Sequence, residues 1–229
     1  MTSRDGRVPA GAGEVAGKAP PLRAPVALFA FNRPELTGRV FGAIRAARPS
    51  RLLLVCDGPR TDRPGDAERC AAVRRILGEI DWPCEVERSF SDANVGCRAR
   101  ISSGIDWVFS RAEEAIFLED DILPDATFFP YCDALLTRYR EDDRVMMISG
   151  YSGLDPGEAP GASYWFSAHP RIWGWAAWRR SWQGYDVTMS GWPAFRKTGA
   201  WASRTREEKE SWGAFFQMVK DGQVDTWDA

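Results

Sequence analysis

Three adjacent carboxylates follow a short apolar run, and they are the strongest candidates for chemistry in this sequence. Glu119, Asp120 and Asp121 come directly after Ile116-Phe-Leu118. Carboxylates crowded at the end of a buried strand repel one another, and burial raises their pKa values. A hard divalent cation, Mn²⁺ or Mg²⁺, would relieve this conflict, because such cations prefer carboxylate and phosphate oxygens. A triplet after a buried strand favours this role over the alternative, an acidic loop in solvent.

Two more polar pairs follow apolar runs. Asn32-Arg33 comes after the first run, and Asp57-Gly58 comes after the second. Asn32-Arg33 is compatible with the start of a helix, but Arg33 is also suited to pair with a phosphate group. Asp57-Gly58 is typical of a tight turn. It also suits an aspartate that accepts an N–H of a bound base beside a glycine that permits close approach, and the sequence leaves both alternatives open.

A fourth candidate is an arginine pair in the segment that begins with Asn94-Val-Gly96. Arg98 and Arg100 lie in the first turns of a predicted helix. Residues two apart do not share a helix face. We therefore expect at most one of the two to point toward a ligand, and Arg100 is the candidate.

The elements that must position these residues alternate between strand and helix. Apolar runs predict strands at Val26–Phe31, Arg51–Cys56, Cys84–Phe90, Ala115–Leu118 and Val145–Ile148. Helical periodicity predicts helices from Asn32-Arg33-Pro34 onward and over Asp66–Ile80, Gly96–Phe109 and Asp125–Tyr139. This alternation predicts a doubly wound α/β fold with a mostly parallel sheet. Ligands bind such sheets at the carboxyl ends of the strands, so the polar residues above should converge on one crevice.

After Gly150 the composition changes, and nine of the eleven tryptophans follow residue 160. Tyr164-Trp-Phe166 is strand-like, Arg171–Trp182 predicts a turn entering a helix, and Arg204–Lys220 predicts an amphipathic helix. The spacing of Trp175, Trp178 and Trp182 is that of a buried helix stripe. Trp173, which precedes a glycine, is the better candidate for a platform under a sugar ring.

We expect three regions along the chain. They are a disordered leader at 1–24, an α/β half at 25–150, and an aromatic-rich half of the same domain at 151–229, incomplete at its C-terminus. The leader lacks the apolar core of a signal peptide.

Charge and composition exclude several classes of function. The net charge of −2 argues against a basic nucleic-acid footprint, and the single histidine argues against zinc sites built on imidazoles. No apolar run is long enough to span a bilayer. Five cysteines without a CxxC pair indicate reduced thiols. The expected location is therefore the cytoplasm, with or without peripheral attachment to the inner membrane face.

Several of these segments, in this order, resemble nucleotide-sugar glycosyltransferases of the GT-A fold. The segments are Phe31-Asn-Arg-Pro34, Cys56-Asp-Gly58, Asn94-Val-Gly96, Leu118-Glu-Asp-Asp121 and Ile172-Trp-Gly-Trp175. The chain looks like a bacterial member of the family-2-like group, and its layout is similar to that of N-acetylglucosaminyltransferase I. The resemblance covers about Val26 to Asp228. It implies that 25–150 is the nucleotide-sugar-binding α/β half and that 151–229 is the acceptor-side half of the same domain.

The resemblance implies a role for each matching position. Asp121 would ligate Mn²⁺ or Mg²⁺ that bridges the donor diphosphate, and Asp57 would contact the uracil ring of a UDP-sugar. The full set expected to bind the nucleotide and sugar is Asn32, Arg33, Asp57, Arg100, Glu119 and Asp120. The acceptor would be a glycan or another molecule with a free hydroxyl.

The resemblance also implies a catalytic base and the stereochemistry of the reaction. Trp227-Asp228 matches a late Trp-Asp pair, so Asp228 would deprotonate the acceptor hydroxyl and the sugar would be transferred with inversion. Two alternatives remain: a truncated or degenerate nucleotide-sugar-binding domain without catalysis, and a sugar-phosphate nucleotidyltransferase. The second would need a glycine-rich basic loop after the first strand, which Phe31-Asn-Arg-Pro34 does not provide.

Overall fold

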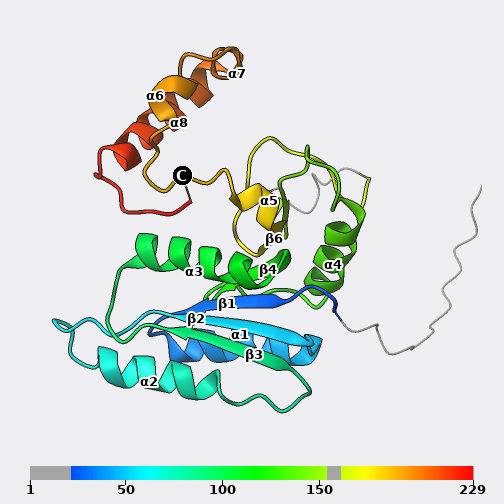
Figure 1. The fold of residues 1–229 in the computed structure, drawn as a ribbon, viewed down its shortest axis with the longest axis vertical. Helices are drawn as coiled ribbons and strands as arrows, with labels where there is room; N and C mark the ends of the chain where they lie inside the picture. The colour runs from blue at the N-terminus through cyan, green and yellow to red at the C-terminus, as the bar shows by residue number, and fades with distance from the viewer. Residues whose placement is uncertain (1–21, 154–160, 229) are drawn as a thin grey trace, which may run out of the picture.

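A six-stranded sheet forms the centre of the part of the chain that the structure describes, residues 22–153 and 161–228 (Figure 1). In this computed structural model the strand order is β3-β2-β1-β4-β6-β5. The strands are β1 Val26–Ala30, β2 Arg51–Cys56, β3 Glu85–Phe90, β4 Glu114–Glu119, β5 Met147–Ser149 and β6 Trp175–Trp178. Strands β1 to β4 pair in parallel, and β6 runs antiparallel to both β4 and β5. The predicted fold class, a mostly parallel α/β sheet flanked by helices, is confirmed.

Helices cover both faces of this sheet. The helices are α1 Pro34–Ala47, α2 Asp66–Ile76, α3 Cys97–Arg111, α4 Phe128–Arg138, α5 Arg179–Trp182, α6 Trp192–Phe195, α7 Gly199–Ala202 and α8 Arg206–Lys220. Residues of α1, α2 and α4 share one buried cluster, and residues of α3 belong to a second cluster on the other face. The fully apolar β1 supplies both, because successive side chains point to opposite faces: Val26 and Leu28 join the first cluster, and Ala27 and Phe29 the second.

The order of the strands reverses between β1 and β4. From β1 the chain proceeds outward to β2 and β3, then crosses back so that β4 pairs with the other side of β1, from Val26↔Ile116 to Phe29↔Glu119. In doubly wound sheets such a switch point opens a crevice at the carboxyl ends of the two strands. The polar residues after β1 and β4 therefore lie at the position where this fold binds ligands.

The aromatic segment before α5 differs from the predicted helix. Trp175–Trp178 is a strand, and only the four residues of α5 are helical. Ala176 and Ala177 are small enough to lie fully inside the sheet between β4 and β5. Trp175 and Trp178 are 7% and 3% exposed, so their predicted core role is confirmed, but they point to opposite faces because they are three residues apart in a strand. Trp182 is only half-buried and stacks on Tyr185, with ring centroids 3.9 Å apart.

The predicted strand at Tyr164–Phe166 is not a strand in the structure. Instead the Tyr164 hydroxyl lies 2.8 Å from the Tyr139 hydroxyl at the end of α4, and the Phe166 ring meets Tyr139 edge-on. These side-chain contacts hold the segment against α4 without any backbone pairing to the sheet.

The C-terminal part both leaves the sheet and returns to it. Helix α8 agrees with the predicted helix, and Thr205 and Glu208 form a capping box at its start. Helices α6 to α8 form a unit away from the sheet (Figure 1), while Trp227 packs back into the second buried cluster. Trp227 and the β6 residues Trp175 and Ala177 therefore pack in the same cluster as residues of β1, β2, β4 and α3.

The expected leader lies mostly outside the described residues. Its last residues are packed rather than disordered: Leu22 and Ala24 are buried, and the amide N–H of Ala24 donates to Asp133 of α4 at 2.9 Å. Among the helices of residues 22–153 and 161–228, none is long and apolar enough to cross a bilayer.

Candidate functional site

The switch point between β1 and β4 brings Arg33 together with two of the three acids. Arg33 Nη1 lies 2.8 Å from Asp121 Oδ2, and Nη2 pairs with Asp120 Oδ1. The other oxygen of Asp120 accepts the Phe31 N–H at 3.1 Å. One guanidinium thus bridges two neighbouring carboxylates through two different nitrogen atoms, an arrangement that the planar fork of arginine provides and the single nitrogen of lysine does not.

Burial disfavours the ionised forms of the buried carboxyl groups in the acidic triplet. Burial, followed by the charges of Asp121 and Asp120, raises the pKa of Glu119 to about 7. Burial also raises the pKa of Asp120 above its usual value, although Arg33 opposes that shift. Burial disfavours the charged form of Arg33, but the attraction and hydrogen bonds of Asp120 and Asp121 still raise its pKa. The site therefore contains more negative charge than one arginine neutralises, and a further cation would be attracted to it.

The residues of the triplet fit a divalent cation only in combination with a second ligand. Within the described residues, no group of three or more His, Cys, Asp or Glu side chains is arranged to hold a metal ion by itself. Asp121 is the accessible acid, with its side chain 40% exposed and only Oδ2 paired to Arg33. Mg²⁺ is typically held by one or two carboxylates, with water and substrate phosphates completing its shell. The predicted Mn²⁺ or Mg²⁺ is thus compatible with Asp121 when phosphate oxygens supply further ligands.

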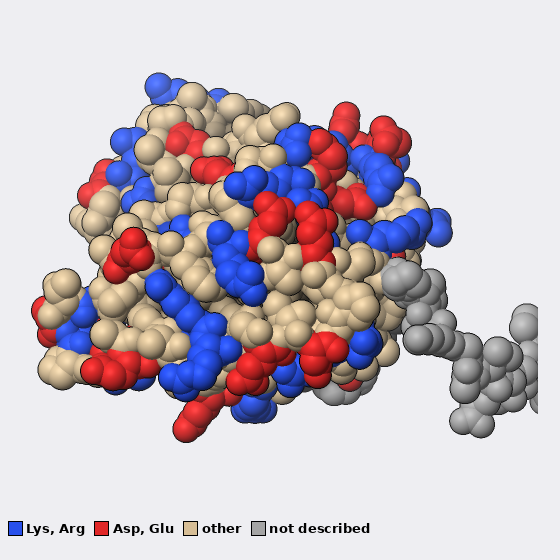
Figure 2. Space-filling model, turned by 60° about the horizontal axis from the view of Figure 1, so that its bottom comes forward, with Lys and Arg blue, Asp and Glu red and all other residues tan. Residues whose placement is uncertain are grey.

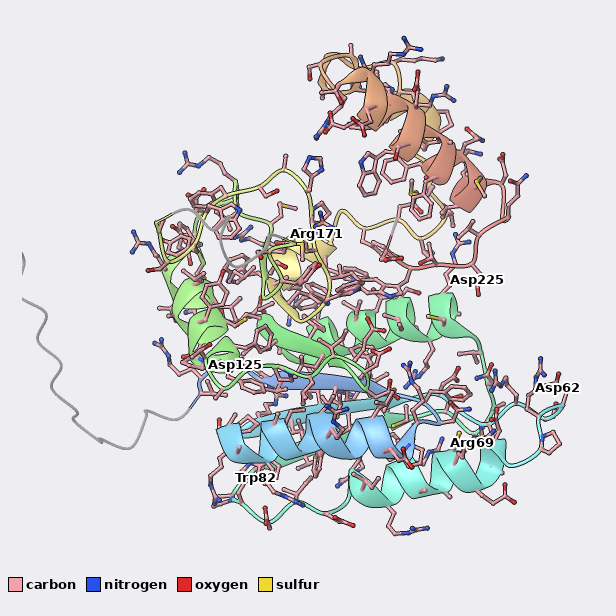
Figure 3. The ribbon with its side chains drawn as sticks, turned by 180° about the vertical axis from the view of Figure 1, so that it is seen from behind. Asp62, Arg69, Trp82, Asp125, Arg171 and Asp225 are labelled. Atoms are coloured by element: carbon pink, nitrogen blue, oxygen red, sulfur yellow. The ribbon has the colours of Figure 1, made fainter. Side chains whose placement is uncertain are left out.

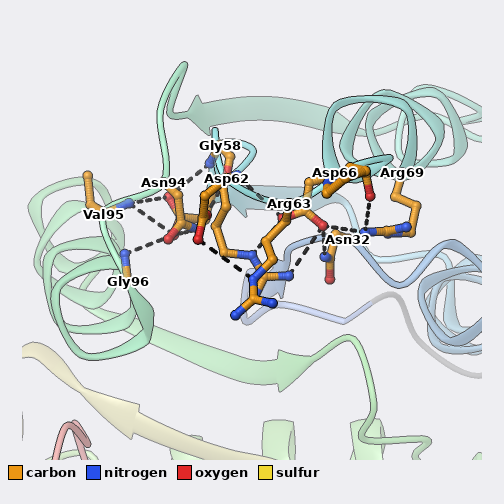
Figure 4. Close-up of polar contacts among 12 residues, drawn as sticks. Asn32, Gly58, Asp62, Arg63, Asp66, Arg69, Asn94, Val95 and Gly96 are labelled. Atoms are coloured by element: carbon orange, nitrogen blue, oxygen red, sulfur yellow. Dashed lines mark hydrogen bonds and ion pairs between the residues drawn. The ribbon is translucent and has the colours of Figure 1, made fainter.

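Both carboxylate oxygens of Asp57 accept hydrogen bonds from groups of the chain itself, and the donor residues Gly58, Asn94, Val95 and Gly96 are labelled in Figure 4. Asp57 is 5% exposed, and its oxygens accept hydrogen bonds from the N–H groups of Gly58, Val95 and Gly96 at 2.8 to 3.2 Å. The Asn94 side-chain amide donates a further bond at 2.8 Å. Asp57 therefore anchors the loop that leads into α3, and a contact with a base stays a prediction.

Gly58 is required for this anchor by close packing. A Cβ at position 58 would lie 2.5 Å from the backbone N and C of Ala93. Backbone atoms cannot give way as a flexible side chain can. The glycine therefore allows the loop after β3 to lie directly against the end of β2, which the sequence motif alone did not reveal.

A buried acid that the sequence reasoning missed organises the neighbouring part of the rim. Asp66, at the start of α2, is completely buried and accepts hydrogen bonds from Asn32, Arg60 and Arg69 at 2.5 to 2.7 Å. Figure 4 shows Asn32 and Arg69 pointing toward it from the β1–α1 loop and from α2. The hydrogen bond from Arg60 holds the pKa of Asp66 far below its usual value, although burial opposes the shift. An aspartate in the first turn of a helix is common, so the sequence carried no signal for this cluster.

Asn32 and Arg100 both contribute to the frame of the crevice. Asn32 donates to Asp66, as described above, so its side-chain amide is already engaged. Arg100 Nε donates to the Cys56 carbonyl at 3.1 Å, and its Nη2 donates to Ser89. Burial lowers the pKa of Arg100 below its ordinary value. Arg100 thus ties together the ends of β2 and β3, and its contact with a nucleotide stays a prediction.

The C-terminal segment returns to this crevice. A Cβ on Gly96 would lie 3.9 Å from Asp225 Oδ2, and Figure 3 shows Asp225 beside the N-terminal end of α3. Trp227 stacks on Trp175 with centroids 6.0 Å apart. The exposed Asp228 follows, and its charge contributes to the raised pKa of Glu119. The predicted base therefore lies within electrostatic range of the acidic triplet, although they are far apart in sequence.

Trp173 lines a cavity that also has Asp121 of the triplet in its wall. The cavity measures about 1110 Å³ and extends from Asp121 along α4 and β5 to the 163–174 loop. Trp173 is 57% exposed, and its ring lies 4.9 Å from that of Tyr151. Asp125 and Arg171, labelled in Figure 3, also belong to the wall. The aromatic half of the chain thus forms a large hollow that begins at the acidic triplet.

Surface charge is mixed rather than one-sided on the face shown in Figure 2. Basic and acidic side chains are interspersed there, and neither sign forms a continuous field. This agrees with the small net charge of the chain.

No family model matches this sequence, and no curated protein matches it. Among solved structures, similarity to three chains is low. A mannosyltransferase from Pyrobaculum calidifontis, PcManGT, in complex with GDP-Man and Mn²⁺, has 17% identity and a TM-score of 0.37 over 56% of this chain and 34% of its own. The chain therefore spans about a third of that protein.

Two other solved structures show a similar level of likeness. A 4-diphosphocytidyl-2C-methyl-D-erythritol synthase from Anaerococcus prevotii has 9% identity and a TM-score of 0.39, with 84% of both chains covered. Rv0371c from Mycobacterium tuberculosis has 15% identity and a TM-score of 0.31 over 56% of this chain and 64% of its own. Folds of this class support many activities, so function must be argued from the site of this chain itself.

Proposed function

We propose that this chain is a metal-dependent glycosyltransferase that moves a sugar from a nucleoside-diphosphate donor to an acceptor hydroxyl. The donor that we propose is a UDP-sugar. One observation carries the proposal: Arg33 and the acidic triplet meet at the switch point between β1 and β4. An arginine beside an accessible carboxylate suits a ligand that carries phosphate and a divalent cation together. The crevice is thus suited to the diphosphate of a donor.

The chain's own residues divide the work of the reaction. Asp121 would hold Mn²⁺ or Mg²⁺, which as a Lewis acid stabilises the negative charge on the departing diphosphate. Arg33 would pair with a phosphate oxygen, and Glu119 and Asp120 would hold the sugar and ribose. Asp228 would take the proton from the acceptor hydroxyl, help typically worth ~10²–10⁴-fold in rate. Attack from the face opposite the leaving group gives inversion.

The position of Asp228 supports its role as the base. Trp227 is 7% exposed, and its carbonyl accepts the Tyr185 hydroxyl at 2.7 Å. These contacts fix the backbone next to an exposed carboxylate near the triplet. The cavity that contains Trp173 would receive the acceptor, a glycan or another molecule with a free hydroxyl, because it begins at Asp121.

Two other functions remain as alternatives. A sugar-phosphate nucleotidyltransferase would bind a triphosphate in a glycine-rich loop after β1, but here Arg33 precedes α1 directly and its carbonyl accepts the Thr37 N–H at 2.9 Å. A domain that binds nucleotide-sugar without transfer would share the crevice but would not need Asp228.

The location proposed for the chain is the cytoplasm or the inner membrane face.

A donor screen tests the proposal. Thermal unfolding would be measured with UDP-sugars and GDP-sugars, with and without Mn²⁺, because a ligand that binds the folded state raises the melting temperature by mass action. We expect stabilisation only with metal and nucleotide-sugar together, followed by release of nucleoside diphosphate when an acceptor is added. Asp121→Asn should abolish both, whereas Asp228→Asn should abolish release and keep binding. Binding of a nucleoside triphosphate in preference to a nucleotide-sugar would contradict the proposal.

A further inference from the structure

The two nitrogen atoms of Arg33 that contact the triplet are held with different firmness. Nη2 pairs with Asp120, which is 1% exposed and whose second oxygen is fixed by the Phe31 N–H at 3.1 Å. Nη1 pairs with Asp121, whose side chain is 40% exposed. Asp120 cannot turn without losing its bond to the backbone, whereas Asp121 can exchange its partner from the solvent side. One end of the guanidinium is therefore anchored, and the other is exchangeable.

The backbone of Arg33 is fixed, so any movement belongs to its side chain. The Arg33 carbonyl accepts both the N–H and the hydroxyl of Thr37, at 2.9 and 2.8 Å, in the first turn of α1. Thr37 is itself completely buried. The Arg33 side chain is 45% exposed, which leaves it room to rotate about the end anchored by Asp120.

We propose that Arg33 pivots on Asp120: a divalent cation displaces it from Asp121, and the released Nη1 then binds a phosphate oxygen of the ligand. This inference rests on the proposed function, because it assumes a ligand with a diphosphate. Without that ligand, Arg33 and the metal are two positive groups that compete for one carboxylate. When the diphosphate is bound, both positive groups contact the same anion, so the metal and the nucleotide strengthen each other's binding.

The pivot predicts reciprocal coupling between metal and nucleotide. The metal alone binds weakly, because it must displace a charge-assisted hydrogen bond and lie beside a cation. A nucleoside diphosphate offers Arg33 a replacement partner and so tightens metal binding. By thermodynamic linkage the metal must tighten nucleotide binding by the same factor.

Binding of Mn²⁺ to the full chain without nucleotide tests the first step. Free Mn²⁺ is counted by electron paramagnetic resonance in wild type, Arg33→Gln and Arg33→Lys. We expect Arg33→Gln to bind Mn²⁺ about fivefold to tenfold more tightly, since an exposed ion pair and a nearby like charge are both removed. Arg33→Lys should lie between the two, because an ammonium keeps the charge but lacks the two separate nitrogen atoms with which the guanidinium holds both acids.

Matched variants locate the effect. Arg45→Gln removes the same charge from α1, the helix that follows Arg33, but Arg45 pairs with Asp81 at 3.3 Å and with Glu79, away from the triplet. It should leave Mn²⁺ binding unchanged. Adding Asp121→Asn to Arg33→Gln should abolish the gain. If Arg33→Gln and Arg33→Lys both fold and bind Mn²⁺ no more tightly than wild type, the competition does not exist.

Titration with UDP in saturating Mn²⁺ tests the second step and separates it from the proposed function. Arg33→Gln should lose affinity for UDP, and the factor by which Mn²⁺ and UDP strengthen each other should fall toward one. Unchanged coupling in Arg33→Gln would overturn the pivot while leaving the proposed function intact. If wild type binds neither UDP nor GDP in the presence of Mn²⁺, the proposed function fails, whatever Arg33→Gln does to the metal.

Discussion

Replacing Asp57 by asparagine separates an anchoring role from a ligand-binding role. The carboxylate accepts three backbone N–H groups and the Asn94 amide. Asparagine keeps one acceptor oxygen but places an NH₂ group against the donors of Gly96 and Asn94. If the Asn94 amide flips, one of these bonds is restored, and the bond from Gly96 is still lost. We therefore expect Asp57→Asn to fold but to be destabilised.

The magnitude follows from the kind of bonds that are lost. A hydrogen bond to a charged group contributes about 1.5–3 kcal/mol, and a buried donor left without a partner costs ~1–3 kcal/mol. With one such bond lost and one donor facing another donor, the free energy of unfolding should fall by about 2–4 kcal/mol. For a chain of this size that corresponds to a shift of roughly 1 M in the urea midpoint at unchanged slope.

The assay is equilibrium urea unfolding, combined with hydrogen exchange over residues 93–97. The control is Asp62→Asn, which removes an acid from the same loop, where its side chain is 76% exposed and 3.8 Å from Arg63. The control should leave the midpoint unchanged. The anchoring argument is wrong if Asp57→Asn is as stable as wild type, shows no faster hydrogen exchange over residues 93–97 and loses only UDP binding. Asp57 would then contact the base.

Three further predictions concern the crevice and its support. Gly58→Ala should be strongly destabilised, because its Cβ would lie 2.5 Å from backbone atoms of Ala93. The control Gly42→Ala on α1 meets nothing within 4 Å, so its free energy of unfolding in urea should rise by about 0.5–1 kcal/mol. Equal urea midpoints for the two variants would refute the packing argument. Because burial raises the pKa of Glu119 to about 7, the folded state binds its proton more tightly than the unfolded state does. In metal-free buffer, wild type should therefore lose stability relative to Glu119→Gln as pH rises from about 4.5 through 7, and a pH-independent difference in melting temperature would contradict this. Trp227→Ala should cost about 3 kcal/mol in urea unfolding, because it removes a 7% exposed indole from the second cluster, and a loss below 1 kcal/mol would show that this segment adds little to the core.

Much of the fold could be read from residue pattern because the strands that matter are buried on both faces. Val26–Ala30 is apolar throughout, and Glu114–Glu119 is apolar between its two terminal glutamates, which is the pattern of a central parallel strand. The prediction of a helix at Trp175–Trp178 is wrong, because tryptophans three and seven residues apart also fit a helix while the segment is a strand. Pairing with β4 and β5 decided for the strand, and no local signal in four residues records such long-range partners.

The candidate site divides in the same way. Local apolar runs predict where the strands end, so the residue pattern is enough to place the acids, Asn32-Arg33 and Asp57-Gly58 at strand ends and hence at one edge of the sheet. Which of these residues contact one another depends on the three-dimensional fold. It paired Arg33 with Asp120 and Asp121, and it engaged Asp57 with backbone N–H groups. The physical reason is that strand order and loop packing set side-chain distances, and these depend on contacts between residues far apart in the chain.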